Sequence, residues 1–224
     1  MLRSLPFVIA VCFALSAVSF SQTGFETDFQ LWNETHFIVP LTKKKDLSFI
    51  LITSGRLGNN GKTATEGRLG GMISKKVNDY VSVGAGYQYR YSNSTFKQSR
   101  YEGRYIGWVT FTVPLIKKLT LVNRNQVQYE DRFSRPNATV IRNRLWLKRE
   151  VTLGKRKVEA FVSFEPFYDT RIKGLARYRT QVGISNKFNK KFSGDLFYVR
   201  QDETGARTRP GTLNGIGTNF RVNF

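Results

Sequence analysis

The last thirteen residues, 212–224, carry the pattern that most limits what this chain can fold into. Counted back from Phe224 to Ile216, every second residue is apolar or threonine, and the residues between them are Asn, Arg or Gly. Such alternation is typical of a β-strand whose two faces meet different surroundings. A soluble sandwich strand can carry it. The closing strand of an outer-membrane barrel carries it with the apolar face toward lipid and the polar face toward the lumen, and we favour this second interpretation.

The first 21 residues are typical of a secretory signal peptide. Arg3 makes a short basic start, residues 5–18 are mostly apolar, and Ser19 and Ser21 supply small side chains before a predicted cut that leaves Gln22 first. A lipoprotein anchor at Cys12 is the weaker alternative, because valine precedes it where a small residue is needed. We therefore expect a signal peptide at 1–21 and a single outer-membrane β-barrel domain at 22–224, located in the bacterial outer membrane.

The composition is strongly basic and almost free of cysteine. Loss of residues 1–21 removes one arginine and no acid, so the formal charge of +20 falls to +19. Cys12 is the only cysteine of the chain, which excludes a disulfide framework and a thiolate metal site. No stretch after Gln22 reaches the ~18 consecutive apolar residues of a membrane helix. A soluble secreted β-protein and a barrel both satisfy that observation.

Eleven segments alternate between apolar and polar residues, and most are about ten to fourteen residues long, enough to cross a bilayer at the usual tilt. The fold class is therefore all-β, a transmembrane antiparallel up-and-down β-barrel of about ten to twelve strands. We favour twelve, because single-chain bacterial barrels have even numbers. Pro166 interrupts one segment and predicts a bulge there. The segments lie near 25–38, 46–57, 66–75, 80–91, 100–113, 119–132, 139–152, 158–169, 176–188, 192–201 and 212–224.

The connections between these segments alternate in character. Every second one is short and rich in lysine, at 43–45, 75–76, 117–118, 155–157 and 187–191. The intervening ones are loops of Gly, Asn, Ser, Thr and Pro, at 58–65, 92–99, 133–138, 170–175 and 202–211. Up-and-down strands would gather the lysines on one rim, predicted to be periplasmic because the turns are short. The expected partners are outer-membrane lipids. We expect no nucleic acid as partner, since no binding motif accompanies the charge.

The polar faces of the segments carry many charged residues. Two hypotheses explain them: a structural ladder of ion pairs between adjacent strands, which we put first, or a basic lane for an anionic solute. A barrel of ten to twelve strands lies between a filled interior and an open channel, so size does not decide between them. The predicted lumen-lining residues are Arg124, Glu130, Arg132, Arg142, Arg144, Glu165, Arg177 and Arg179.

The sequence offers little for catalysis and more for assembly. His36 is the only histidine and lacks a suggested nucleophile. We therefore predict no enzyme, no catalytic residue, no cofactor and no metal site. The apolar face of the last strand, with its terminal aromatic residue, predicts an assembly signal for the barrel-assembly machinery at Phe220, Val222 and Phe224.

Several short motifs resemble the bacterial family described as domain of unknown function 2490. They are Gln30-Leu31-Trp32, Tyr129-Glu130-Asp131-Arg132, Arg142-Asn143-Arg144, Phe164-Glu165-Pro166-Phe167, Arg179 with Gly183, and Tyr198-Val199-Arg200-Gln201. The resemblance implies an outer-membrane β-barrel and no established activity. The expected function is structural, or a narrow porin-like pore for small solutes, anionic ones among them. The alternatives are a membrane-embedded lipid-modifying enzyme and a soluble secreted β-protein.

Overall fold

The computed structural model describes residues 26–93, 100–116, 118–133, 135–154, 156–204 and 210–224. The predicted signal peptide, residues 1–21, lies outside the described residues. These ranges form eleven strands: β1 (Glu26–Pro40), β2 (Leu47–Gly58), β3 (Thr63–Lys76), β4 (Val81–Ser92), β5 (Arg100–Ile116), β6 (Leu119–Arg132), β7 (Ala138–Leu153), β8 (Arg156–Asp169), β9 (Gly174–Lys187), β10 (Phe192–Glu203) and β11 (Gly211–Asn223). Within these ranges no helix is long and apolar enough to cross a membrane.

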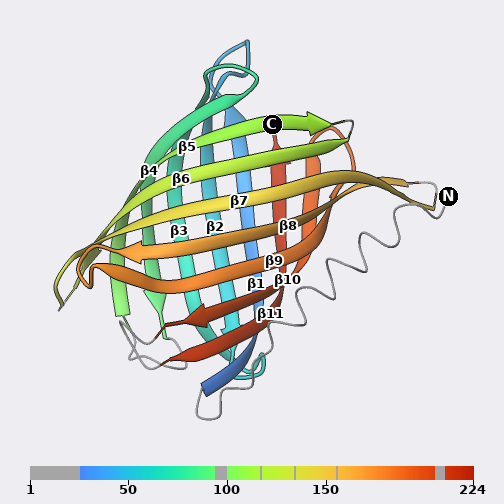
Figure 1. Ribbon diagram of the computed structural model, residues 1–224. Coiled ribbons are helices and arrows are strands. Elements are labelled where there is room, and N and C mark those ends of the chain that lie inside the picture. Colours follow the sequence, from blue (N-terminus) through green and yellow to red (C-terminus); the bar gives the residue numbers. More distant parts are fainter. Residues whose placement is uncertain (1–25, 94–99, 117, 134, 155, 205–209) are drawn as a thin grey trace.

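The strands close into one barrel in which each strand pairs with its sequence neighbours (Figure 1). Consecutive strands pair antiparallel, and the blue β1 lies beside the red β11 and runs parallel to it, from Glu26 opposite Gly211 to Ile38 opposite Asn223. The prediction of an all-β barrel is confirmed. Eleven described strands lie within the predicted range of ten to twelve, but the favoured number of twelve and antiparallel pairing throughout are wrong for the described residues. An odd number of up-and-down strands leaves the first and last pointing the same way, so the closing ladder is parallel.

The outer and inner faces of the barrel differ as the alternation predicts. Outward residues are large and apolar, as Leu69 and Ile216 show with 57% and 46% of their surface exposed. The most deeply buried side chains include Gln201 and Glu102, each 1% exposed. A soluble domain has the opposite arrangement, with apolar residues inside and charged residues outside. The barrel therefore has a polar interior and an apolar outer surface.

Outward tyrosines and phenylalanines form two groups near the opposite ends of the barrel. Tyr91 and Tyr101 pack with ring centroids 5.1 Å apart where β4 ends and β5 begins. At the other end, Phe192 of β10 stacks on Phe188 at 5.2 Å and on Phe220 at 5.6 Å. Outer-membrane barrels carry such aromatic girdles at both interfaces of the apolar band.

Two irregularities of the sequence pattern have structural explanations. On β10, which alternates poorly in sequence, Phe197 and Val199 point inward while Leu196 and Tyr198 are exposed. The ladder of β7 and β8 continues in register past Pro166, but it has a gap there, as expected for a residue without a backbone N–H. The register shift lies on the other ladder of β8, the one with β9, between Phe167 and Tyr168. The predicted bulge is thus displaced from the proline itself.

Aromatic side chains fill part of the lumen at mid-height. Trp32, Phe161, Phe197 and Val199 form a buried cluster, with Trp146 packed against it. Glycines make the room that these rings occupy. A Cβ on Gly217 would lie 2.3 Å from the Phe197 ring, closer than any real contact. The cluster occupies one side of the lumen.

Candidate functional site

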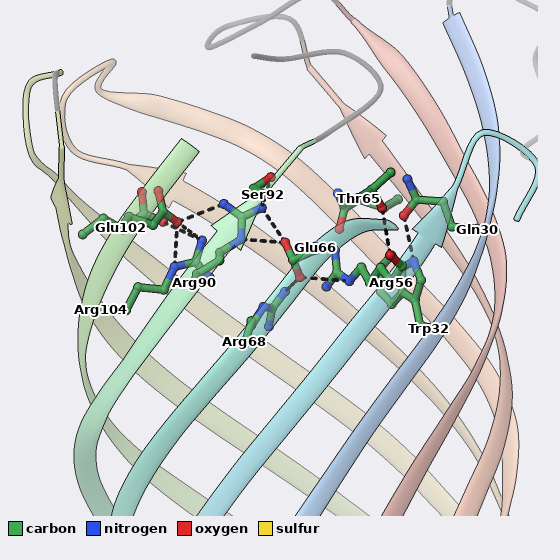
Figure 2. Close-up of polar contacts among 12 residues, drawn as sticks. Gln30, Trp32, Arg56, Thr65, Glu66, Arg68, Arg90, Ser92, Glu102 and Arg104 are labelled. Atoms are coloured by element: carbon green, nitrogen blue, oxygen red, sulfur yellow. Dashed lines mark hydrogen bonds and ion pairs between the residues drawn. The ribbon is translucent and has the colours of Figure 1, made fainter. Parts of the chain in front are cut away.

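The end of the lumen beneath the longer loops is crossed by ion pairs. We call this end the loop rim. Glu66 of β3 accepts hydrogen bonds or ion pairs from Arg56 of β2 at 3.1 Å, from Arg68 of its own strand, and from Arg90 of β4 at 2.6 Å. Figure 2 shows these side chains converging inside the barrel from three adjacent strands. Arg90 also donates to Glu102 of β5 at 3.0 Å, so one guanidinium links two carboxylates.

The network continues around the wall from Glu102. This carboxylate also accepts from Arg104 Nε at 2.8 Å and from Arg135 Nη2 at 2.6 Å. Arg104 lies 3.6 Å from Glu130 of β6, which also pairs with Arg132. Like Glu102, the Arg132 side chain has almost no exposed surface. Alternating charges on neighbouring strands thus follow the wall.

Glu165 of β8 is the meeting point of three arginines. Arg142 donates to it at 2.7 Å, Arg144 pairs with its other oxygen, and Arg179 of β9 lies at 3.4 Å. Arg179 also donates to Gln201 at 2.7 Å. A buried carboxylate and its arginines stabilise one another only as a complete set, because an unpaired buried charge is costly.

Together these side chains form what we call the ion layer. Its members are Glu66, Glu102, Glu130, Glu165 and Glu203 with Arg56, Arg68, Arg90, Arg104, Arg132, Arg142, Arg144, Arg177 and Arg179. The hollows lined by its residues measure about 20 and 30 Å³, each with room for about one water molecule. In the described part of the chain, the ion layer therefore fills the lumen near the loop rim.

On the side of the ion layer that faces away from the loop rim lies a cavity of about 220 Å³. Its wall carries more positive than negative side chains: Glu34 and Glu165 face Arg56, Arg68, Arg124, Arg142, Arg144 and Arg179. Trp32, Trp108, Ile106 and Phe197 supply apolar surface to the same wall. The cavity is thus polar, basic and partly aromatic.

The cavity wall extends toward the opposite end of the barrel, where the short turns lie. We call this end the lysine rim; its described lysines are Lys43, Lys44, Lys45, Lys75, Lys76, Lys118, Lys157, Lys187, Lys190 and Lys191. A hollow of about 870 Å³ opens there, which we call the mouth. Lys45, Lys187, Lys190 and Arg221 are among the residues that line it. Basic side chains thus outnumber acidic ones on the walls of both the cavity and the mouth.

Two acidic residues of the lysine rim form hydrogen bonds or ion pairs within its turns. The Asp46 carboxylate accepts a hydrogen bond from the Thr42 hydroxyl, and this bond lowers the pKa of Asp46. Lys76 Nζ donates to Asp79 at 2.6 Å and lowers the pKa of that carboxyl. Both carboxylates are therefore ionised at neutral pH and partly offset the lysines.

The residues predicted to line the lumen lie at three heights. Glu130, Arg132 and Arg177 lie in the ion layer, the last paired with Glu203 at 3.4 Å. Arg142, Arg144 and Arg179 meet at Glu165, where the ion layer borders the cavity. Arg124 lines the cavity, whose wall also carries Arg142, Arg144 and Arg179. Three of these arginines thus share one carboxylate, and Arg177 lies over the same Phe167 ring as Arg142 and Arg179.

Sequence reasoning missed the half of the ion layer that lies on β2–β5. Glu66, Arg68 and Arg90 were not selected, although they have the inward parity of their segments. Arg56 was not selected either. The available signal was charge on a predicted polar face, which marks a residue as inward but not its partner. Partner choice depends on the register between strands, which the sequence leaves open.

The remaining candidates have plain surroundings. His36 lies on the inner face of β1, 2.7 Å from Glu34, and makes no hydrogen bond to a serine or threonine hydroxyl of the described residues. No group of three or more metal-ligating side chains occurs in those residues. At the C-terminus, Phe220 stacks on Phe192, and the Phe224 N–H donates to the Ile38 carbonyl at 3.1 Å.

Comparison with known proteins gives one match. The family model described as "Protein of unknown function (DUF2490)" matches residues 29–209. This range runs from β1 to the connection before β11 and so includes the ion layer and most of the cavity wall. No curated protein and no solved structure matches the sequence.

Proposed function

Because the chain belongs to the DUF2490 family of proteins of unknown function, we propose its function from the barrel itself. The protein is an outer-membrane β-barrel whose lumen is a blind cavity, closed at the loop rim and open at the lysine rim. Its role is structural or solute-binding, and it does not act as a pore for free diffusion.

The distribution of side chains supports the outer-membrane location. An outer surface of Leu, Ile, Val, Phe and Tyr would be costly in water, and in lipid it is the ordinary surface of a barrel. The interior holds charges that lipid would not tolerate. A closed barrel also leaves no unpaired strand edge, as a membrane-spanning sheet requires. These properties favour the membrane barrel over a soluble secreted β-protein.

The connections support an orientation with the lysine rim in the periplasm. Bacterial barrels have short periplasmic turns and longer extracellular loops. The turn between β9 and β10 needs only residues 188–191, whereas residues 204–210 join β10 to β11. In this orientation the mouth opens to the periplasm and the ion layer lies beneath the cell surface.

The ion layer is the single observation that favours a blind cavity over a narrow pore. Its charges pair laterally between adjacent strands, and Glu66, Glu102 and Glu165 each bind three or more arginines. Opening a path would require breaking several buried ion pairs, each costing about 3–5 kcal/mol when one partner is lost. The ladder hypothesis therefore has more support than the anionic lane.

Fractionation and planar-bilayer recording test this proposal. The mature protein is expected in the outer membrane, and the purified protein is expected to show no steady current in 1 M KCl. Recovery from the soluble fraction would contradict the membrane location. A steady current with an anion-selective reversal potential under a KCl gradient would instead establish the narrow pore.

The enzyme alternative has its own test. A lipid-modifying enzyme that uses the only histidine would lose lipid hydrolysis in a His36→Ala variant. We expect no hydrolysis in either protein, because the contact that His36 makes is with Glu34 inside the lumen. Hydrolysis by the parent that disappears in His36→Ala would contradict the proposal.

A further inference from the structure

We propose that the cavity contains a binding site for a small oxyanion, a carboxylate or phosphate group, centred on Arg124 and Arg144. The inference rests on the proposed function only for the route of entry, through the mouth. The site itself depends on four residues of β5–β7: the two arginines and the tryptophans beside them, Trp108 and Trp146.

Arg124 and Arg144 lie directly opposite each other on adjacent strands. They are Cα partners in the β6–β7 ladder, and both have the inward parity. Both guanidinium groups lie near the Trp146 ring, with their carbons 5.7 and 5.0 Å from its centroid. Like charges directly opposite on a sheet destabilise it. A bound anion would relieve this repulsion.

The existing carboxylates do not neutralise this pair. Arg144 shares Glu165 with Arg142 and Arg179. Arg124 has no carboxylate within 4.0 Å among the described residues, whereas each of the other arginines that line the cavity has one. Arg124 therefore lacks the counter-charge that its neighbours have.

The surroundings of Arg124 hold its guanidinium in place and leave donors free. Its Nε donates to the Thr110 hydroxyl at 3.0 Å. Its guanidinium carbon lies 5.8 Å from the Trp108 ring centroid and 5.7 Å from that of Trp146. Nε is the atom of Arg124 that binds protein in the described residues, so the terminal N–H groups remain for a ligand. The free edge of this planar guanidinium, formed by its two terminal nitrogens, matches the two oxygens of a carboxylate or phosphate.

The shape and charge of the lumen fit a small anion. The cavity of about 220 Å³ is below the ~300–1,000 Å³ of pockets for drug-sized ligands. The basic mouth, lined by Lys45, Lys187, Lys190 and Arg221, would raise the local concentration of anions and guide them inward. The tryptophans at the site limit access of water, which strengthens a charge interaction.

Tryptophan fluorescence offers a direct measurement, because the three tryptophans of the chain, Trp32, Trp108 and Trp146, are all inward. The full-length mature protein in detergent is titrated with sodium phosphate and, separately, with sodium acetate, at an ionic strength held constant with NaCl. We expect a saturable change with at least one of them. The anion that saturates identifies the group; saturation by neither would overturn the proposal.

Arg124→Gln is the decisive variant. It is expected to weaken the apparent affinity at least tenfold, while keeping the heat-dependent gel mobility of a folded barrel. The matched control is Arg200→Gln, which removes one positive charge outside the lumen, where Arg200 pairs with Asp202 at 3.0 Å. An unchanged affinity in Arg124→Gln, or an equal loss in Arg200→Gln, would contradict the site.

If Arg124→Gln cannot be purified as a folded barrel, the unfolding temperature of other variants tests the site instead. The saturating anion should raise the unfolding temperature of the parent and of Arg200→Gln, but not of Arg124→Lys, which keeps the charge and loses the planar fork. A rise in Arg124→Lys equal to that of the parent would overturn the proposal. These results do not depend on conductance, so a current in planar bilayers would contradict the blind cavity and leave the anion site standing.

Discussion

Glu165 of β8 and Arg179 of β9 are direct partners across their ladder, and an ion pair of 3.4 Å joins their side chains inside the barrel. Glu165 also holds Arg142 and Arg144 from the strand on its other side. Its side chain is only 3% exposed. One buried carboxylate thus ties three strands together and balances part of the charge of three arginines.

We predict that Glu165→Gln destabilises the barrel by about 3–5 kcal/mol, the usual cost of removing one partner of a buried ion pair. Glutamine keeps the shape and some hydrogen bonds but leaves three guanidinium groups without their shared counter-charge. The measurement is urea unfolding of the protein in lipid vesicles, followed by the heat-dependent shift in gel mobility.

The matched control for this change is Glu159→Gln on the same strand. Glu159 pairs with Lys148 at 2.9 Å and its side chain is 41% exposed, so the loss should stay below about 1 kcal/mol. Equal losses in the two variants would show that Glu165 has no special place in the network.

Three asparagines on the outer surface give a second prediction. Asn125 and Asn143 are opposite each other near the middle of β6 and β7, and Asn123 completes a ring of hydrogen bonds of 2.6, 2.7 and 3.2 Å. Asn125→Leu should cost about 1–3 kcal/mol, because it deprives the Asn143 amide of its acceptor and the Asn123 oxygen of its donor. Unfolding in lipid vesicles measures the change.

Replacing all three asparagines by leucine should cost less than Asn125→Leu alone. The triple variant leaves no polar group without a partner, and its leucines face lipid if the proposed location holds. In a soluble protein the same change would enlarge an exposed apolar patch and cause aggregation. Aggregation of the triple variant under conditions where the parent stays in the membrane fraction would therefore count against the lipid-facing assignment.

The positions of most strands could be predicted from the sequence. The segment predicted at 119–132 is β6, Leu119–Arg132, and Arg124 and Glu130 have the inward parity expected of them. The reason is that the two faces of each strand meet opposite environments, so a period of two remains visible along the chain. A one-residue error would have reversed every side chain of a strand.

The closure of the barrel and the pairing inside it could not be predicted. The parallel ladder that places Leu31 opposite Ile216 depends on how many strands the barrel contains, and alternation within a strand carries no information about that number. Likewise, the link from Glu66 through Arg90 to Glu102 depends on the stagger between strands, which closure sets for the whole sheet. The general rule of even strand numbers favoured twelve and misled the prediction.

The C-terminal residue gives a third prediction. Phe224 is largely exposed, at the lysine rim, and its N–H binds the Ile38 carbonyl. A charge near the membrane interface costs little, from about 0 to 1 kcal/mol, so Phe224→Asp should leave the refolded barrel stable in vitro. Assembly in cells should nevertheless fail if the terminal aromatic is read by the assembly machinery.

The control for assembly is Phe188→Asp. Phe188 is also exposed at the lysine rim and stacks on Phe192 at 5.2 Å, but it is not terminal. We expect this variant to reach the outer membrane. Normal insertion of Phe224→Asp, measured by heat-dependent gel mobility in membrane fractions, would remove the terminal residue from the assembly signal.

The parallel pairing of β1 and β11 makes a fourth prediction, about which rim faces the outside. Single cysteines are introduced at three exposed positions. They are Thr27 at the start of β1, Asn60 in the β2–β3 connection and Lys44 on the lysine rim. A membrane-impermeant maleimide should label Thr27→Cys and Asn60→Cys in intact cells, and Lys44→Cys only after permeabilisation. Labelling of Lys44→Cys alone in intact cells would reverse the orientation. Labelling of Asn60→Cys without Thr27→Cys would place the start of β1 at the other rim, which is incompatible with a parallel ladder to β11.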